Sequence, residues 1–334
     1  MRTLIIAEAG VNHNGNVRIA KRLVLSAKKA GADFIKFQTF NPVSLTTKNA
    51  NQAPYQFKNI KKKQSQRKML EKLALTKNDF ITLKKYSKKI NIGFLSTAFD
   101  IESLGFLIKK CELKIIKIPS GEITNYPYLR FAGSLKKKIF LSTGMSEVKE
   151  IERAVKTLIA AGTRKTKITI LHCTSSYPAP EKELNLKALV LLRKKFNIEV
   201  GYSDHSDKIE TSVAAVALGA KVIEKHFTLN KRFKGPDHKS SIDVIELKKM
   251  VDMIRNTEKS LGCEKKLLTK SEKKNLVLVR KSIVALRRIK KGELFTEENI
   301  TCKRPANGIS PIHWKKVIGK KAKKNFLPDQ FITI

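Results

Sequence analysis

The chain has 334 residues and is 41 % hydrophobic, enough for one large barrel with a small domain or for two medium domains. No apolar run reaches the roughly 20 residues of a membrane span, and the N-terminal "TLIIAEAG" does not resemble a signal peptide. The four cysteines are scattered, which fits reduced thiols rather than a disulfide scaffold or a zinc ribbon. These features predict a cytoplasmic protein without a membrane-spanning segment.

The charge is unusual, with 69 lysines and arginines against 29 acidic residues and a formal net charge of +40. Such basicity raises the question of nucleic-acid binding. The lysines, however, are spread along the whole chain and do not form one stripe interleaved with aromatic residues. We interpret most of them as solvated surface residues, and an anionic substrate or polyanion surface stays open as a partner.

Short apolar runs rich in β-branched residues recur along the chain, at residues 3–10, 34–40, 92–99, 114–122, 138–144, 168–175, 198–205 and 222–229. Segments with apolar residues at helical spacing lie among them or follow the last, at 17–31, 77–90, 147–162, 208–219 and 241–261. Eight strand–helix units predict a closed (β/α)8 TIM barrel. An open doubly wound sheet is the alternative, but no G-x-G-x-x-G follows the first run.

Two regions depart from this alternation. Residues 41–76 are long, polar and lysine-rich and contain Tyr55 and Phe57, which predicts a lid or binding loop, or else a disordered segment. After the last helix, shorter elements and turn signals begin near Val279. We therefore expect a catalytic barrel over 1–262, a linker over 263–278 and a small domain over 279–334.

Nearly every predicted strand ends in side chains that bind ligands or transfer protons, and in a (β/α)8 barrel chemistry is built at these carboxyl ends. His205 and His226 close the seventh and eighth strands, so their imidazoles can share one divalent metal, with Glu8, Asp204 and Glu224 as neighbours. Two nitrogens with hard oxygens favour Mn²⁺ or Mg²⁺ over structural zinc. A hydrogen-bonded structural histidine is the alternative for either residue alone.

Lysines and hydroxyls at other strand ends suit an anion. Lys36 and Lys117 lie on the second and fourth strands, and serines close several others. Together they form a cradle for a phosphate or carboxylate, although snorkelling lysines with capping serines would read the same way. After the eighth strand, "KGPDHKSS" places Asp237 and His238 on a turn above the barrel mouth, where a plain loop is the other reading.

The motifs "AEAGVNHNG", "IKFQTF", "KIPSGEITNYPYL", "STGM", "HCTSSYPAP", "GYSDHS", "IEKHFTL", "GPDH" and "KRPANGISP" resemble the bacterial sialic acid (nonulosonate) synthase family in order and over nearly the whole chain. That family comprises N-acetylneuraminate synthase and its legionaminate and pseudaminate relatives. "CTSSYPAP" looks more like the pseudaminate branch, whereas "KIPSGEITNYPYL" and "GPDH" resemble the neuraminate and legionaminate branch.

The resemblance implies a (β/α)8 barrel followed by a small antifreeze-like (SAF, β-clip) domain, and a domain-swapped homodimer in which that domain caps the partner's barrel. The implied reaction condenses phosphoenolpyruvate with an open-chain N-acetylated aldose, such as N-acetylmannosamine or a diacetamido sugar, and releases phosphate. The rivals are another metal-dependent phosphoenolpyruvate–sugar synthase on the same barrel and a basic nucleic-acid-binding barrel protein.

The resemblance also implies residue roles. His205 and His226 match the ligands of a Mn²⁺ or Mg²⁺ ion that polarises the aldehyde. Arg304 matches an arginine that reaches the partner's site to contact the N-acyl group. The positions that match phosphoenolpyruvate binding are Lys36, Thr97, Lys117, Ser120, Ser142 and Ser203. Ser175 stands in the phosphate-binding loop, at a position where the family often has Asn. Those that match the sugar and acid–base network are Glu8, Gln38, Glu122, Tyr177, Glu224 and Asp237.

Overall fold

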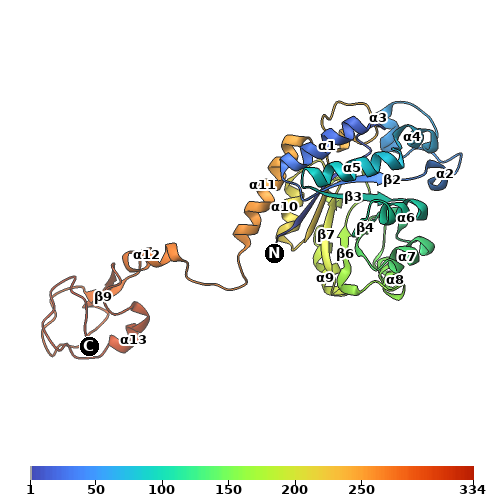
Figure 1. The fold of residues 1–334 in the computed structure, drawn as a ribbon. Coiled ribbons are helices and arrows are strands. Elements are labelled where there is room, and N and C mark those ends of the chain that lie inside the picture. The colour runs from blue at the N-terminus through green and yellow to red at the C-terminus, as the bar shows by residue number, and fades with distance from the viewer. Residues whose placement is uncertain (1) are drawn as a thin grey trace. The chain divides into compact units, whose positions relative to one another are not determined.

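The computed structural model describes residues 2–334, which divide into two compact units, residues 2–262 and residues 263–334. In the first unit eight parallel strands close into a barrel in sequence order, as the eight apolar runs predict (Figure 1). The strands are β1 (Leu4–Gly10), β2 (Phe34–Thr39), β3 (Gly93–Ala98), β4 (Ile115–Ile118), β5 (Lys138–Ser142), β6 (Ile168–His172), β7 (Glu199–Asp204) and β8 (Val222–His226).

Helices surround the barrel, and the five predicted helical segments are all present. The helices of this unit are α1 (Val17–Ala30), α2 (Pro42–Leu45), α3 (Pro54–Ile60), α4 (Gln66–Leu73), α5 (Lys77–Lys89), α6 (Ile101–Lys109), α7 (Tyr126–Ser134), α8 (Val148–Ala160), α9 (Ala188–Phe196), α10 (Glu210–Ala217) and α11 (Val244–Leu261). Local signals set their limits: Asn16 caps α1 by accepting from two backbone N–H groups, and Gly31 ends it at φ 86°. No helix within residues 2–334 has the length and apolar content needed to cross a bilayer.

Residues 41–76 form three helices, α2 to α4, between β2 and β3. Apolar side chains of this insertion pack into a small cluster of their own with Val11, built on Met69, Leu70 and Leu73. The sequence left open an ordered lid or binding loop and a disordered segment, and the structure shows an ordered subdomain attached to the barrel.

The barrel interior changes character along its axis because side chains alternate between the lumen and the helix layer. Toward the amino ends of the strands, apolar residues fill the lumen as one cluster. The members of this cluster are Ile6, Leu95, Phe140, Leu171 and Val222, with Leu4, Phe34 and Ile115 packed against them. The next inward position on most strands is polar, so a packed apolar floor lies beneath the strand ends.

The second unit is a small β-rich body. It contains α12 (Lys270–Val279), β9 (Ser282–Ala285), β10 (Ile300–Lys303) and α13 (Trp314–Val317). β9 and β10 pair antiparallel, and isolated bridges add Phe331, Phe326 and Lys321 to the same body. Its own core includes Ile283, Phe295 and Phe326, so it has a separate hydrophobic centre. Much of the range predicted as a linker, 263–278, is occupied by α12.

The space around Gly201 shows how tightly the lumen is packed. A Cβ at this position of β7 would meet Leu171 Cδ2 at 2.6 Å and the Val222 carbonyl oxygen at 2.6 Å. Gly201→Ala should therefore lower the free energy of unfolding by about 1–3 kcal/mol through overpacking, measured by thermal and denaturant unfolding.

Gly105→Ala in α6 is the matched control, because the added methyl would lie 4.0 Å from Phe131 Cζ of α7, which is ordinary van der Waals contact. Alanine is also the better helix former, by about 1 kcal/mol, so this variant should be as stable as the parent or more stable. Equal stability of Gly201→Ala and the parent would show that the lumen is loosely packed.

Candidate active site

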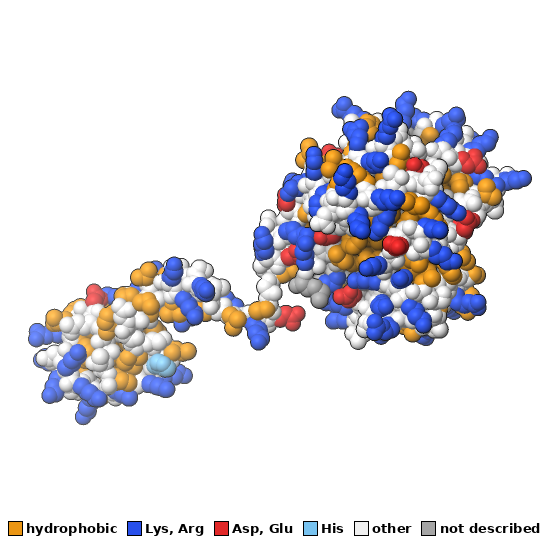
Figure 2. All heavy atoms as spheres, in the orientation of Figure 1, with side chains coloured by type: hydrophobic (Ala, Val, Ile, Leu, Met, Phe, Trp, Pro, Cys, Tyr) orange, Lys and Arg blue, Asp and Glu red, His pale blue; other side chains and the backbone are white. Residues whose placement is uncertain are grey.

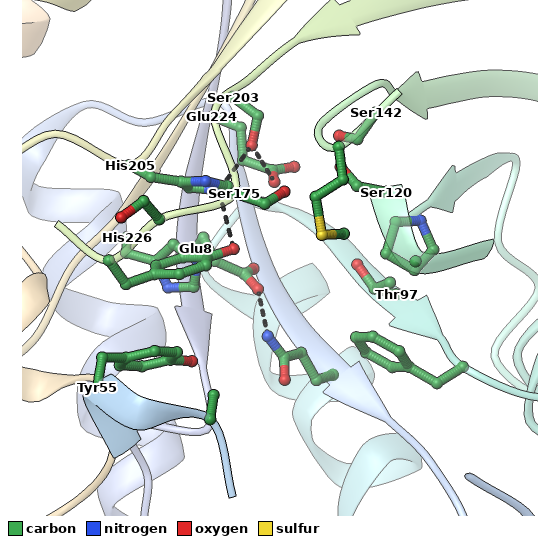
Figure 3. Close-up of a pocket in the computed structure, with 18 of the residues that line it drawn as sticks. Glu8, Tyr55, Thr97, Ser120, Ser142, Ser175, Ser203, His205, Glu224 and His226 are labelled. Atoms are coloured by element: carbon green, nitrogen blue, oxygen red, sulfur yellow. Dashed lines mark hydrogen bonds between the residues drawn. The ribbon is translucent and has the colours of Figure 1, made fainter. Parts of the chain in front are cut away.

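A cavity of about 600 Å³ opens at the carboxyl ends of the barrel strands (Figure 3). All eight strands or the turns directly after them contribute to it, and the insertion between β2 and β3 adds further residues. Of the residues predicted from the sequence, it brings together Glu8, Lys36, Gln38, Thr97, Lys117, Ser120, Ser142, Ser175, Tyr177, Ser203, His205, Glu224 and His226. A site so placed, above an apolar floor, is typical of (β/α)8-barrel enzymes.

Strand alternation explains why these side chains share one space. On β8, Glu224 and His226 both line the cavity, whereas the intervening Lys225 does not. On β7 and the residue after it, Ser203 and His205 line the cavity and the intervening Asp204 does not. On each of these strands, therefore, alternate polar residues face the cavity, and the polar residue between them faces the helix layer.

Two lysines and two glutamates form a buried charge network at the floor of the cavity. Lys36 Nζ lies 2.9 Å from Glu8 Oε2 and 3.6 Å from Glu224 Oε1, and Lys117 Nζ lies 3.4 Å from the same Glu224 oxygen. All four side chains are at most 4 % exposed. Since a buried charge without a partner is costly, each of these groups depends on the others to remain ionised.

Hydroxyl groups complete the network. Lys36 donates to Thr97 Oγ1 at 2.7 Å, and Lys117 donates to Ser142 Oγ at 2.8 Å. Ser203 donates to Glu224 Oε1 at 3.1 Å. The ammonium groups are thus held in fixed positions, which prepares them for an anionic ligand.

The two carboxyl groups differ in proton affinity although they share Lys36. Burial raises the pKa of Glu8 to about 7, since the opposing effect of Lys36 only partly offsets desolvation. Burial acts on Glu224 too, but Lys117, Lys36 and the two histidines together hold its pKa at about 2. Near neutral pH the site therefore contains one carboxylate anion and one carboxyl group able to hold or release a proton.

His205 and His226 lie with ring centroids 5.7 Å apart. Burial lowers the pKa of His205 to about 4 and that of His226 well below its ordinary value, so both imidazoles are neutral near pH 7. The Nδ1 of His205 lies 2.7 Å from the carbonyl oxygen of Thr174. A donor hydrogen at Nδ1 leaves the Nε2 lone pair of His205 on the side of Tyr177 and Ser203.

This donor set suits a divalent metal. Glu224 Oε2 and His226 Nδ1 are both buried and have no hydrogen-bond partner among residues 2–334. Neutral imidazoles and an unpartnered carboxylate oxygen are the ligands that Mn²⁺ accepts. Within the same residues no three His, Cys, Asp or Glu side chains form a ready ligand group, so an ion here would take further oxygens from substrate or water.

A turn of small residues lies beside the lysines. The backbone N–H of Gly144 donates to Ser120 Oγ at 2.9 Å, and Ser120 Oγ lies 3.2 Å from Cys173 Sγ. A Cβ on Gly144 would lie only 2.1 Å from Ser175 Oγ. Glycine at this position therefore allows the Ser120 hydroxyl, after β4, and the Ser175 hydroxyl, after β6, to converge on one small space.

Stacked aromatic rings form one wall of the cavity. Tyr177 lies over His205 with centroids 4.2 Å apart, and Tyr55 of α3 stacks on Tyr177 at 5.1 Å. Tyr55 also donates to Asp237 Oδ1 at 3.3 Å. Asn59 of the same helix donates to the carbonyl oxygen of Pro236 at 2.6 Å, so α3 is tied to the turn after β8.

Tyr55, Gln56 and Gln66 line the cavity but were not among the predicted site residues. The unusual length of the 41–76 connection was the signal that pointed to this segment, although it did not single out these side chains. A long polar connection predicts a segment that covers the barrel mouth. Which of its side chains point into the cavity is set by the packing of its helices, which the sequence does not show.

Three predicted site residues lie outside the cavity lining. Asp237 is buried next to it, against Tyr55. Glu122 accepts from Asn125 Nδ2 at 2.6 Å in the turn after β4, and burial raises its pKa. Arg304 is exposed in the second unit, directly after β10.

The expectation that Asp204 neighbours the metal site is wrong. Its carboxylate lies 3.0 Å from Lys225 Nζ and accepts from the hydroxyls of Thr211 and Ser212. As the residue between Ser203 and His205, it must point to the opposite face of β7, toward the helix layer.

The fold and the cavity together define a (β/α)8-barrel enzyme with a buried, charge-balanced site at the mouth of the barrel. Residues 23–266 match the NeuB family, and residues 280–334 match the SAF domain. The chain is 52 % identical to the N,N'-diacetyllegionaminic acid synthase of Campylobacter jejuni, covering 99 % of each chain. It is 42 % identical to the Legionella pneumophila enzyme of the same name, covering 97 % of this chain and 92 % of that one.

A solved structure agrees with these relatives. The N-acetylneuraminic acid (sialic acid) synthetase of Leptospira borgpetersenii, in complex with citrate, superposes with a TM-score of 0.72 at 34 % identity, over 82 % of this chain and 90 % of that one. The chain therefore belongs to the NeuB family and is an acid synthase, which confirms the resemblance and the two-part architecture predicted from the sequence.

Asp237→Asn should make stability less dependent on pH. Burial raises the pKa of Asp237 from 3.8 to about 6, so the folded chain binds this proton more tightly than the unfolded chain. The stability linked to the proton is present below about pH 4 and is lost as the pH rises toward 6, by up to roughly 3 kcal/mol. Asparagine still accepts from Tyr55 but does not ionise.

Thermal unfolding of the parent and of Asp237→Asn at about pH 4 and about pH 7.5 measures this effect. The variant should gain stability relative to the parent at the higher pH. An equal difference at both pH values would mean that Asp237 does not carry the proton.

Proposed function

We propose that this enzyme condenses phosphoenolpyruvate with a six-carbon aldose bearing two acetamido groups, to give a nine-carbon 2-keto acid of the N,N'-diacetyllegionaminic acid type and phosphate. The observation that carries the proposal is the cavity itself, in a chain 52 % identical over its length to a synthase of that name. Three carbons from phosphoenolpyruvate and six from the aldose account for the nine carbons of the product.

The lysine end of the cavity suits phosphoenolpyruvate. Lys36 and Lys117 supply two buried ammonium groups, and the hydroxyls of Ser120, Ser142 and Ser203 lie around them. Phosphoenolpyruvate carries about three negative charges near neutral pH, and charge-assisted hydrogen bonds of this kind are the strong ones. Thr97 and Ser175 are proposed as further members of the same subsite.

The reaction then needs a proton acceptor and a stabilising anion. Carbon 3 of phosphoenolpyruvate attacks the aldehyde carbon, the C=C bond and the C=O π bond are consumed, and positive charge develops at carbon 2. Glu224, held as an anion, can stabilise that charge. The aldehyde oxygen becomes a hydroxyl by taking up a proton, which Glu8 can supply. Water adds at carbon 2 and loses a proton, for which Glu8 is placed as the exchanging group, and the tetrahedral intermediate expels phosphate.

His205 and His226 are the residues proposed to hold Mn²⁺ or Mg²⁺, which when bound would polarise the sugar aldehyde as a Lewis acid. The neutral imidazoles are available as ligands because burial opposes their protonation. Glu8, Gln38, Tyr177 and Asp237 are proposed to orient the sugar, and Glu122 to support them.

The small domain has a separate proposed role. Residues 279–334 would cap the sugar subsite in a domain-swapped homodimer, with residues 263–278 as the connection. The exposed guanidinium of Arg304, at the end of β10, would contact an N-acyl group of the sugar in the partner's site.

Phosphate release from phosphoenolpyruvate tests the function. The arms are the diacetamido hexoses of the legionaminate and pseudaminate types, N-acetylmannosamine, and no sugar, each with Mn²⁺ and with a chelator. Release with the legionaminate-type sugar, lost with the chelator and accompanied by a product of the expected mass, is the predicted result. Turnover with another sugar alone would correct the substrate, and silence in every arm would overturn the proposal.

Gly144→Ala probes the proposed phosphate subsite without altering charge. The added methyl would displace Ser175 Oγ, 2.1 Å away, and crowd Ser120 Oγ, 3.0 Å away. Losing one hydrogen bond to a charged ligand is worth about 1.5–3 kcal/mol, so KM for phosphoenolpyruvate should rise roughly 10- to 100-fold. The KM for the sugar should change far less.

Gly105→Ala, outside the cavity, is the control for adding a methyl to this chain. Steady-state kinetics with each substrate varied in turn separates the two subsites. An unchanged KM for phosphoenolpyruvate in a folded Gly144→Ala protein would place phosphate elsewhere in the cavity.

A further inference from the structure

We propose that a buried ion pair on the outer face of the barrel, Lys225 with Asp204, positions the two active-site histidines and Glu224. Neither residue lines the cavity, so they are positioning residues rather than catalytic ones. The kinetic part of this inference rests on the proposed function, and its structural part does not.

The pair is placed between the site residues of two adjacent strands. β7 and β8 are in register with Ser203 opposite Glu224 and Asp204 opposite Lys225. The first of these rungs faces the cavity, where Ser203 donates to Glu224. The second faces the helix layer, where Lys225 Nζ lies 3.0 Å from Asp204 Oδ2.

Lys225 does more than neutralise a charge. Its Nζ also donates to the backbone oxygens of Ser206 at 2.7 Å and Lys208 at 2.8 Å. These two carbonyls belong to the connection that directly follows His205. The side chain of Lys225, which precedes His226 on β8, therefore fixes the backbone that directly follows His205.

Asp204 holds the same connection from the other side. Its carboxylate accepts from Ser206 N at 2.9 Å and from Ser206 Oγ at 2.7 Å. It also accepts from Thr211 Oγ1 at 2.6 Å and Ser212 Oγ at 2.7 Å, both in α10. The carboxylate thus ties the carboxyl end of β7 to the helix that follows.

Energetics favour a positioning role over a purely stabilising one. Lys225 and Asp204 are each 1 % exposed, and a buried ion pair is often no more stabilising than apolar residues of the same volume. Apolar side chains at these positions would fill the same layer between barrel and helices. They would supply none of the directional bonds that fix the turn after His205.

Lys225→Met and Asp204→Asn test the inference, with Lys248→Met as the control. Lys248 pairs with Asp252 on the exposed face of α11, so its replacement makes the same chemical change outside the barrel. Asp204→Asn keeps the size of the side chain and is the variant to use if Lys225→Met does not fold. Thermal unfolding establishes which proteins are folded.

The first readout needs neither metal nor substrate. Long-range ¹H–¹⁵N spectra of the histidine rings report the protonated nitrogen and its environment, and His205→Ala and His226→Ala assign the two signals. In the folded Lys225 and Asp204 variants these two ring signals should shift or broaden, while those of His13 and His313 stay in place. The control variant should reproduce the parent spectrum.

The second readout is the division between kcat and KM. Apart from Ser175 after β6 and Ser203 on β7, the proposed phosphoenolpyruvate subsite lies on β2 to β5 and the turns after them, so KM for phosphoenolpyruvate should change less than kcat does. Misplaced groups on β7 and β8 should lower kcat by roughly 10- to 100-fold. Unchanged ring signals in a folded Lys225 or Asp204 variant would overturn the inference, even if no sugar is turned over.

Discussion

The active site depends on one electrostatic constraint, the mutual neutralisation of Lys36, Lys117, Glu8 and Glu224 at the floor of the barrel mouth. None of the four could remain ionised there alone, because a buried charge without a partner costs several kcal/mol. Together they leave Glu224 as an anion and Glu8 near its ionisation midpoint at neutral pH. The barrel thus contains both preorganised cations for an anionic ligand and a carboxyl group that can exchange a proton.

Strand alternation is the means by which the chain satisfies this constraint without losing its core. Below the charged layer, Ile6, Leu95 and Phe140 fill the lumen, and Gly201 leaves room for their neighbours. On the outer face of β7 and β8, Asp204 and Lys225 form a second polar layer that is fully hydrogen-bonded. The same two strands therefore carry reactive groups inward and a fixed ionic contact outward, one residue apart.

The sequence predicted the barrel and most of the cavity, because eight apolar runs alternating with helical segments indicate a closed barrel and polar residues near each strand end indicate its mouth. The strand-end positions of Lys36, His205 and Glu224 predict that these side chains share one space, and all three line the cavity. The sequence misjudged Asp204, since a polar residue at a strand end reads alike on either face until the register with Lys225 is known. It named Tyr55 in the predicted lid or binding loop but did not assign it to the cavity, because its place beside Tyr177 depends on the packing of α3 in a long insertion.

The surface charges that make up most of the net charge of +40 act differently from the four buried charges, because they are exposed to water and screened by salt. Figure 2 shows lysine and arginine side chains scattered over the visible face of each unit, among apolar and neutral residues. Charges at an exposed surface are screened over about 8–10 Å at physiological ionic strength, so they can raise the local concentration of anions without orienting any of them. Orientation requires groups that are desolvated and held by hydrogen bonds, as Lys36 is by Thr97 and Lys117 by Ser142. On the proposed function, specificity for the anionic substrate would therefore reside in Lys36 and Lys117, whereas the exposed lysines act only on the ionic surroundings of the enzyme.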